Sequence, residues 1–262
     1  ESVVWLAERK NVLALALSLW SMERYIAARQ EAVRSRALRL GGVALTFLII
    51  AMLAKVHALV VPVVLACYEV LIGRGAWKIR VAWVAPFALV AAVLTGVKLA
   101  GLGEQISGLP LGGSRMAAVC SSGPVWVRYL SHTVAPWSLS FFYYVPELEP
   151  LSIFGWGAWA LTGVLAALTI RFSHRRMLVL FCWAAALASL GPAINLAAQP
   201  IPMADHYHVW ALPFLLIGLA ELFASLLERL PHNRAKWLGV LLSAAVAASF
   251  ALVAFFEASV YE

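Results

Sequence analysis

Long apolar segments alternate with short polar segments along most of the chain. A helix needs about 20 mainly apolar residues to cross the hydrocarbon core of a bilayer. The pattern predicts about eight such spans, near residues 11–26, 38–54, 58–72, 81–98, 153–170, 178–193, 209–226 and 237–256. Residues 38–72 are interpreted as two short helices, because a single span would place Lys55 and His57 at its centre, where charge is costly.

The composition supports a membrane protein rather than a soluble domain. Of the 262 residues, 63% are hydrophobic and 13% are charged, whereas soluble domains have about 45–50% apolar and about 25% charged residues. We therefore predict an all-α fold, a polytopic transmembrane helix bundle that forms one domain over residues 1–262. Because the chain opens at Glu1 within a patterned segment and stops at Glu262, we expect a fragment of a longer protein.

Positive charge is concentrated on one side of the predicted topology. The rich side holds fourteen of the twenty Lys and Arg residues: Arg24, Arg29, Arg34, Arg36, Arg39, Arg74, Lys78, Arg80, Arg171, Arg175, Arg176, Arg229, Arg234 and Lys236. The other side holds Arg9, Lys10, Lys55, Lys98, Arg115 and Arg128. The positive-inside rule makes the rich side cytoplasmic and places both chain ends on the outer face. Orientation explains the net charge of +7, so no nucleic-acid partner is expected, and the composition favours a bacterial inner membrane.

The longest outer segment, residues 99–152, is rich in Gly, Pro and Ser. Within it, residues 125–135 predict a short helix that lies on the membrane or re-enters it, since irregular backbone at membrane depth must be covered by protein. Trp210, near the start of a span, is typical of an interfacial anchor. Glu69 falls inside a span, so it requires a cavity or a nearby Arg as a partner.

Several polar residues gather at the outer ends of the predicted spans: Glu1, Arg9, Lys55, His57, Asp205 and His206. Ionisable groups at membrane depth are candidate functional residues. Four of them also have a structural interpretation. Arg9 would anchor a helix end, Lys55 would extend to the interface, His57 would be a polar turn residue, and Asp205 would be a helix N-cap. His206 and His208 are two positions apart and point to different faces of a helix, so no metal site is predicted.

Four segments resemble a known family in the same order. Residues 1–13, ESVVWLAERKNVL, are similar to its ESVAWVAERKDVL segment. Residues 53–69, 128–144 and 191–213 are similar to its LSKE…LPLLLLLYD, YL…PLNLSVFY and PVLN…MADRYLYLP segments. The chain thus resembles the transmembrane and tetratricopeptide-repeat proteins and their bacterial relatives. These are similar to the dolichyl-phosphate-mannose protein mannosyltransferases of the GT-C class.

The resemblance implies a membrane glycosyltransferase. The donor would be a polyprenyl-phosphate sugar, and the acceptor a protein or glycan on the outer, periplasmic or lumenal, face. Arg9, Lys55 and His206 would hold the donor phosphate, and Asp205, Glu1 and His57 would line the catalytic site. No cofactor is assigned, and a divalent metal ion is left open.

The sequence also departs from the family pattern. His206 stands where the family usually has Arg, and Val56 stands where Glu or Pro is common. The acidic residues expected of a GT-C catalytic base precede the segment that matches Glu1. A non-catalytic membrane subunit or scaffold on the same fold, with a membrane-complex partner, is therefore an alternative. A transporter of a lipid-linked substrate is a second one, although the sequence lacks the internal symmetry that is common in transporters.

Overall fold

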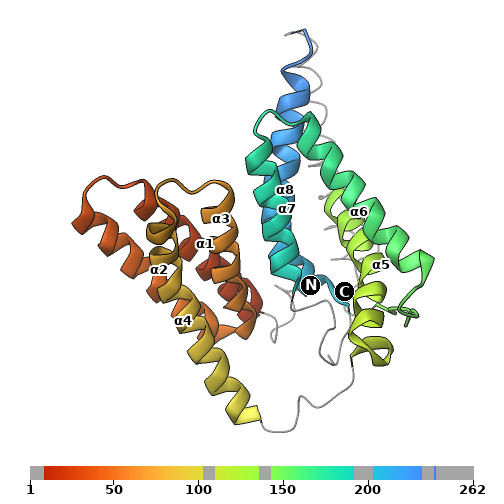
Figure 1. Cartoon of the computed structure of the whole chain (residues 1–262), viewed down its shortest axis with the longest axis horizontal. Helices are drawn as coiled ribbons and strands as arrows, with labels where there is room; N and C mark the ends of the chain where they lie inside the picture. Colours follow the sequence, from red (N-terminus) through yellow and green to blue (C-terminus); the bar gives the residue numbers. More distant parts are fainter. Residues whose placement is uncertain (1–8, 103–109, 136–142, 192–202, 232–238, 240–262) are drawn as a thin grey trace, which may run out of the picture.

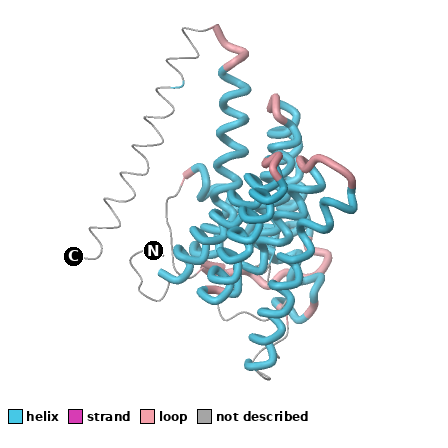
Figure 2. Tube along the Cα trace, turned by 90° about the vertical axis from the view of Figure 1, so that its left-hand side faces the viewer, coloured by secondary structure: helices cyan, strands magenta, loops and turns pink. Residues whose placement is uncertain are grey.

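The computed structural model describes residues 9–102, 110–135, 143–191, 203–231 and 239. Within these residues all regular structure is helical, as predicted, and no strand is present (Figure 2). The helices are α1 (Arg9–Gln30), α2 (Arg34–Ala54), η2 (Val56–Val60), α3 (Val61–Leu71), α4 (Trp77–Leu102), η4 (Leu111–Gly113), α5 (Arg115–Val134), α6 (Ile153–Phe172), α7 (Arg176–Leu190) and α8 (Asp205–Leu227).

Four of the described helices are long and apolar enough to cross a membrane: α2, α4, α6 and α8. The predicted spans 11–26, 58–72 and 178–193 lie on α1, on η2 with α3, and mainly on α7, but these segments are shorter or less apolar. The predicted span 237–256 falls outside the described residues, apart from residue 239. The chain therefore has the character of an integral membrane protein, while the number of eight spans stays a prediction.

The helix α1 is less apolar because the face that it buries is partly polar. Asn11, Ser18 and Ser21 are buried on this face, and the Ser21 hydroxyl donates a hydrogen bond of 2.7 Å to the carbonyl of Ala44 in α2. Small residues allow helix backbones to approach closely in membrane proteins. α1 and α2 accordingly form a closely packed hairpin.

The predicted break between two short helices at residues 55–57 is confirmed. α2 ends at Ala54, and Lys55 adopts an extended conformation with φ −153°. The chain then forms the short helix η2 before α3 begins, with Pro62 in the first turn of α3. Proline is tolerated there because the first amides of a helix have no intrahelical acceptor. Lys55 and η2, which contains His57, therefore connect the end of α2 to the start of α3.

The helices form two groups that are connected through α3 and α7. In Figure 1, α1 to α4 lie on the left and α5 to α8 on the right. α3 packs against α7, while α7 also packs against α8, and α5 against α6. His57, just before α3, contacts Ser189, near the end of α7. Because α3 and α7 are thus antiparallel neighbours, the end of α3 and the start of α7 lie at the same end of the bundle.

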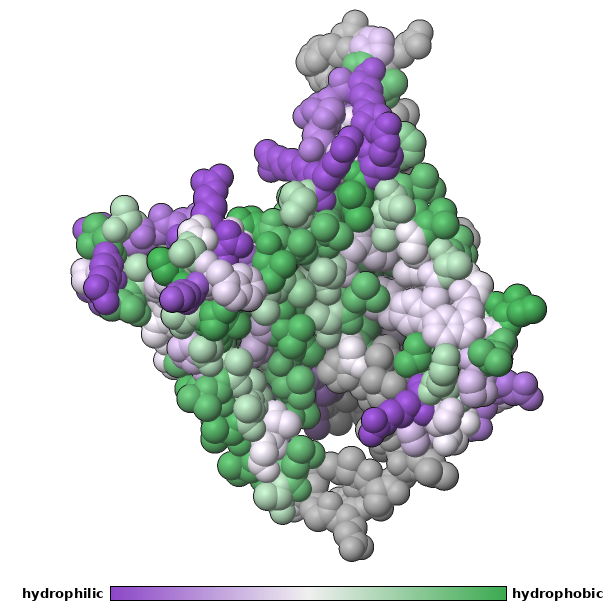
Figure 3. Space-filling model, in the orientation of Figure 1, coloured by the Kyte–Doolittle hydropathy of each residue, from purple (hydrophilic) through white to green (hydrophobic). Residues whose placement is uncertain are grey.

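The described parts of the loops rich in Lys and Arg share this end, which we call the basic end. Figure 3 shows hydrophilic residues over the upper ends of both helix groups, above a broad hydrophobic region. A smaller hydrophilic group lies at the lower right. The arrangement agrees with the charge pattern of the sequence. Which end faces the cytoplasm stays a prediction.

The helix α5 is longer than the predicted short helix at residues 125–135. It begins at Arg115, where Ser114 caps it by accepting a hydrogen bond of 3.1 Å from the amide of Ala117. Its first half packs closely against α6, because Gly123 and Gly155 leave room for the two backbones. The sequence did not predict the first half of α5, because this segment contains Ser, Gly and Pro and has no clear apolar pattern. Packing against α6 stabilises the helix there.

Candidate functional site

The beginning of α8, at the end opposite the basic end, is where distant parts of the chain meet. Met203, Ala204, Tyr207, His208 and Trp210 belong to this region and contact residues from α1, η2, α5 and the segment after α5. We call this set of contacts the α8 cluster. All four segments on which the family resemblance rests contribute to it. The sequence order of these segments did not itself predict that they would meet.

One side of the α8 cluster is formed by α1 and η2. The indole nitrogen of Trp210 donates a hydrogen bond of 3.3 Å to Oδ1 of the buried Asn11. The ring of His57 lies 4.8 Å from that of Trp210 and is stacked near Tyr207 at 6.3 Å, measured between ring centres. Trp210 is only 2% exposed. Its interpretation as an interfacial anchor is therefore wrong, and it instead joins α8 to the first half of the chain.

The other side of the α8 cluster is formed by α5. The hydroxyl of Tyr129 donates a hydrogen bond of 3.0 Å to the carbonyl of Ala204, the N-cap residue of α8. The hydroxyl of Thr133 donates to the carbonyl of Tyr129 and lies 2.9 Å from Nε2 of His208. Since that hydroxyl has one proton, Nε2 of His208 is the donor in the second contact. These bonds hold the start of α8 against α5.

Tyr143 extends this second side. Its amide donates a hydrogen bond of 3.3 Å to the carbonyl of Met203. The guanidinium of the exposed Arg128 lies 4.2 Å from the centre of the Tyr143 ring, in a cation–π contact. His132 is buried, with its ring 5.6 Å from that of Tyr143. An arginine of α5 is thereby placed beside the residues that precede α8.

The predicted site residues that the structure describes lie at this end of the molecule. Arg9 is the exposed first residue of α1, and Lys55 is the half-buried residue between α2 and η2. Each lies two positions from a side chain that contacts Trp210, namely Asn11 and His57. No described contact joins Arg9 to Lys55 directly. The backbone positions of both cations thus lie at the end of the molecule that holds the α8 cluster, and their role in a site stays a prediction.

The remaining predicted residues are only partly described. Asp205 and His206 are the first two residues of α8, but their side chains lie outside the described part of the structure. Glu1 lies outside the described residues altogether. The N-cap of α8 is Ala204, so the interpretation of Asp205 as the N-cap is wrong. As the first residue within the helix, a carboxylate at position 205 would be favoured by the helix dipole.

His57 is placed differently from a polar turn residue. It is only 6% exposed, and its Nε2 lies 2.7 Å from the carbonyl oxygen of Ser189. A carbonyl only accepts hydrogen bonds, so Nε2 carries the proton and cannot serve as a base in this arrangement. Replacing His57 with Phe should keep the ring packing but remove the imidazole donor from the carbonyl of the buried Ser189. We expect a loss of about 1–3 kcal/mol in unfolding free energy, measured by denaturation in detergent.

A cavity of about 330 Å³ lies beside the α8 cluster, between α5, α6, α7 and α8. Its walls are apolar, with side chains such as Val127, Leu165, Trp183 and Phe214, and only Ser131, Thr133 and Thr169 add hydroxyl groups. The volume is within the usual range for small-molecule sites. Within the described residues, no group of three potential ligands could hold a metal ion. The cavity therefore suits an apolar group rather than a cation.

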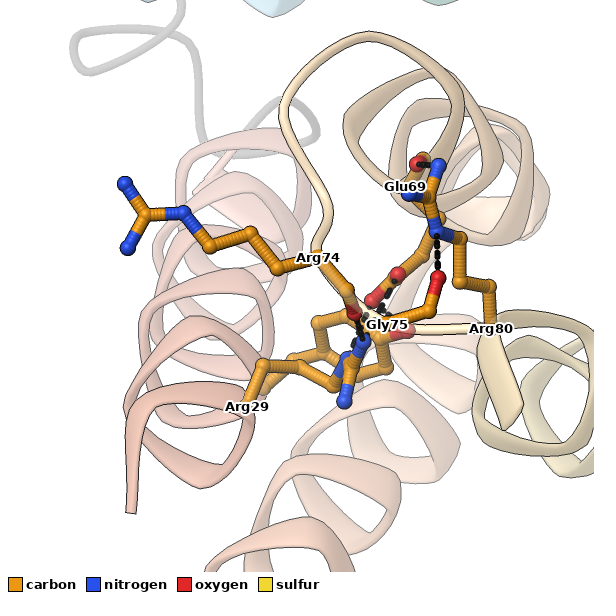
Figure 4. A network of polar contacts seen from close by, with 6 residues as sticks. Arg29, Glu69, Arg74, Gly75 and Arg80 are labelled. Atoms are coloured by element: carbon orange, nitrogen blue, oxygen red, sulfur yellow. Dashed lines mark hydrogen bonds and ion pairs between the residues drawn. The ribbon is translucent and has the colours of Figure 1, made fainter. Parts of the chain in front are cut away.

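A second polar centre lies at the basic end, around the buried Glu69 (Figure 4). The side chain of Glu69 is 2% exposed, and its carboxylate accepts hydrogen bonds from Arg29 at 2.5 and 3.1 Å. Tyr25 donates a further hydrogen bond of 2.8 Å. The predicted requirement for a nearby Arg is confirmed. Because both partners of Glu69 belong to α1, the centre fastens α1 to the end of α3.

Two further arginines surround this centre in different ways. Arg80 of α4 donates to the carbonyl of Glu69 at 2.9 Å and to that of Gly75 at 3.0 Å. Arg29 also donates to the carbonyl of Arg74 at 2.8 Å, whereas the side chain of Arg74 points away from Glu69 (Figure 4). The centre thus joins α1, α3, α4 and their connecting loop. These internal contacts assign it a structural role.

Comparison with known proteins places the chain in no family: no family model, curated protein or solved structure matches it.

Proposed function

We propose that this chain is the membrane part of a glycosyltransferase that takes its sugar from a polyprenyl-phosphate donor. The observation that carries the proposal is the convergence of the four family-like segments on the start of α8. Asn11, His57, Tyr129 and Trp210 come from these segments and meet in one cluster. On this proposal the basic end faces the cytoplasm, and the α8 cluster faces the outer side, where a protein or glycan acceptor is glycosylated.

The proposed reaction divides into binding and transfer. Arg9 and Lys55 bind the donor phosphate, as cations do at other phosphate sites. The acceptor hydroxyl attacks the anomeric carbon while a carboxylate, with Asp205 as the candidate in this chain, accepts its proton. The bond between the sugar and the phosphate oxygen breaks, and polyprenyl phosphate leaves with the electron pair. The apolar walls beside the α8 cluster exclude water from the donor.

Replacing both Arg9 and Lys55 with Ala should lower sugar transfer by about a hundredfold or more, because two charge-assisted contacts are lost. The assay measures radiolabel that moves from a polyprenyl-phosphate sugar to membrane or periplasmic acceptors, using the full-length protein in liposomes. Lys98 is a matched control, since it is exposed on α4 and belongs to the same Lys- and Arg-poor side. Undiminished transfer by the double variant would contradict the assigned roles.

A non-catalytic membrane subunit is the second candidate, and the placement of His57 favours it. Nε2 of His57 donates to the carbonyl of Ser189, so this edge of the buried ring joins η2 to α7. If the chain is a non-catalytic subunit, the role of the α8 cluster is to stabilise the packing of the helices. Absence of transfer across a panel of polyprenyl-phosphate sugars, with the folded protein co-purifying with a stable partner, would favour the subunit over the enzyme.

A further inference from the structure

An apolar groove of about 610 Å³ runs between α5 and α6, on the side of α5 that faces Ile153 and Leu161. Pro124 and Val127 form its α5 wall, and Gly157 lies on its α6 wall. A Cβ atom added at Gly157 would meet no atom within 4 Å. The missing side chain at this position therefore leaves the groove open.

The groove carries a positive charge. Arg128 lines it and is exposed, and its guanidinium is held 4.2 Å from the centre of the Tyr143 ring. Within the described part of the chain, Arg128 forms no ion pair with a carboxylate. A cation that is not neutralised beside an apolar groove is complementary to a ligand with an anionic head and an apolar tail. Tyr143, which holds the guanidinium, also bonds to Met203 in the α8 cluster.

We propose that this groove binds the polyprenyl chain of a polyprenyl phosphate, with the phosphate at Arg128. The assignment rests on the proposed function for the identity of the lipid. Val127, Gly157 and Leu161 contact the isoprene units, and the guanidinium donates charge-assisted hydrogen bonds to the phosphate oxygens. This adds Arg128 to the phosphate ligands that the sequence suggested.

The adjacent cavity between α5 and α8 is a poorer place for the same lipid. It shares Val127 and Ser131 with the groove, but no charged residue lines it. A phosphate there would be desolvated without a cation, which is unfavourable. Of these two sites, the groove is the one that combines apolar walls with a guanidinium.

The test uses the full-length protein in phosphatidylcholine liposomes that contain an undecaprenyl phosphate with a photoreactive group in its chain. Covalent labelling is measured against increasing unlabelled undecaprenyl phosphate, which yields an apparent affinity, and the labelled peptides are identified by mass spectrometry. We expect labels on α5 and α6. Gly157→Leu should weaken binding by about tenfold or more, because the new side chain fills the groove.

Arg128→Gln should weaken binding of undecaprenyl phosphate by about tenfold while leaving the affinity for undecaprenol unchanged. The matched controls are Gly163→Leu in α6 and Arg115→Gln in α5. Gly163, like Gly157, has open space around an added Cβ, and Arg115, like Arg128, is exposed, but neither residue lines the groove. Both controls should bind like the unaltered protein. Thermal unfolding of each variant identifies any that fail to fold.

The outcomes separate this proposal from the proposed function. Labelling of α5 and α6 that Gly157→Leu and Arg128→Gln both weaken supports the groove, even if no sugar is transferred. Equal binding by both variants and both controls overturns it, even if transfer is observed. Equal competition by phosphatidylcholine also overturns it, because the groove would then hold ordinary bilayer lipid.

Discussion

Replacing Arg29 with Ala should lower the free energy of unfolding by about 3–5 kcal/mol. The substitution removes two hydrogen bonds from the carboxylate of Glu69, whose side chain is 2% exposed. It leaves a buried charge with Tyr25 as its remaining described side-chain donor. Leaving an uncompensated buried charge is among the most costly single changes a protein can undergo. Reversible unfolding in mixed detergent micelles measures the effect.

A double variant separates the buried charge from the packing of Arg29. Arg29→Met with Glu69→Leu replaces the ion pair by apolar side chains of similar length, which is often neutral or nearly so. We expect the double variant to be more stable than Arg29→Ala. Arg24→Ala is the control, because Arg24 and Glu23 pair at 2.8 Å with side chains that are 46% and 55% exposed. Its expected cost is below about 1 kcal/mol, and an equal cost for Arg29→Ala would contradict the prediction.

Replacing Gly155 with Ala should cost about 3 kcal/mol or more, by forcing α5 away from α6. The added methyl group would overlap Sγ of Cys120 and come within 2.5 Å of the Cys120 carbonyl oxygen. Backbone atoms cannot rotate aside as a flexible side chain can, so relief requires a shift of the whole helix. The hydrogen bond of 2.8 Å from the Trp159 indole to the carbonyl of Val119 would be strained by the same shift. Thermal unfolding in detergent measures the loss.

Gly157→Ala is the matched control for this prediction. Gly157 lies two residues further along α6, and a Cβ atom there meets nothing within 4 Å. Because Ala favours a helix over Gly by about 1 kcal/mol, the control should leave stability unchanged or slightly higher. Equal effects at the two positions would show that helix propensity, rather than the contact between α5 and α6, governs this part of the fold.

The helices that face lipid were the most predictable part of the protein. Spans near 38–54, 81–98, 153–170 and 209–226 were predicted on α2, α4, α6 and α8. A run of apolar residues is enough to stabilise such a helix in a bilayer, whatever it packs against. The first half of α5 was missed because its stability depends on a contact with α6. Its Gly123 is a helix breaker by local propensity but a requirement of that contact.

The candidate site could be predicted only as a set of residues at one end of the spans. Arg9, Lys55 and His57 were recognised because polar groups interrupt an apolar pattern there. Trp210 was misinterpreted, since an indole near the end of a span has the same local signature whether it anchors at an interface or packs inside. Its hydrogen bond joins it to Asn11, 199 positions away. Arg128 was not predicted as a site residue, because the groove that it lines forms only where α6 packs beside α5.

Hydropathy and charge are properties of short segments, so the sequence by itself determined that the chain is helical, that it has the character of a membrane protein and that most of its Lys and Arg residues fall in one set of loops. The tertiary structure decided which helices are neighbours, because close packing depends on the shapes of residues far apart in the chain. The packing of α1 beside α3 brought Arg29 to Glu69 as its ion-pair partner. The tertiary structure also brought the four family-like segments together at the start of α8, and opened the groove beside Arg128.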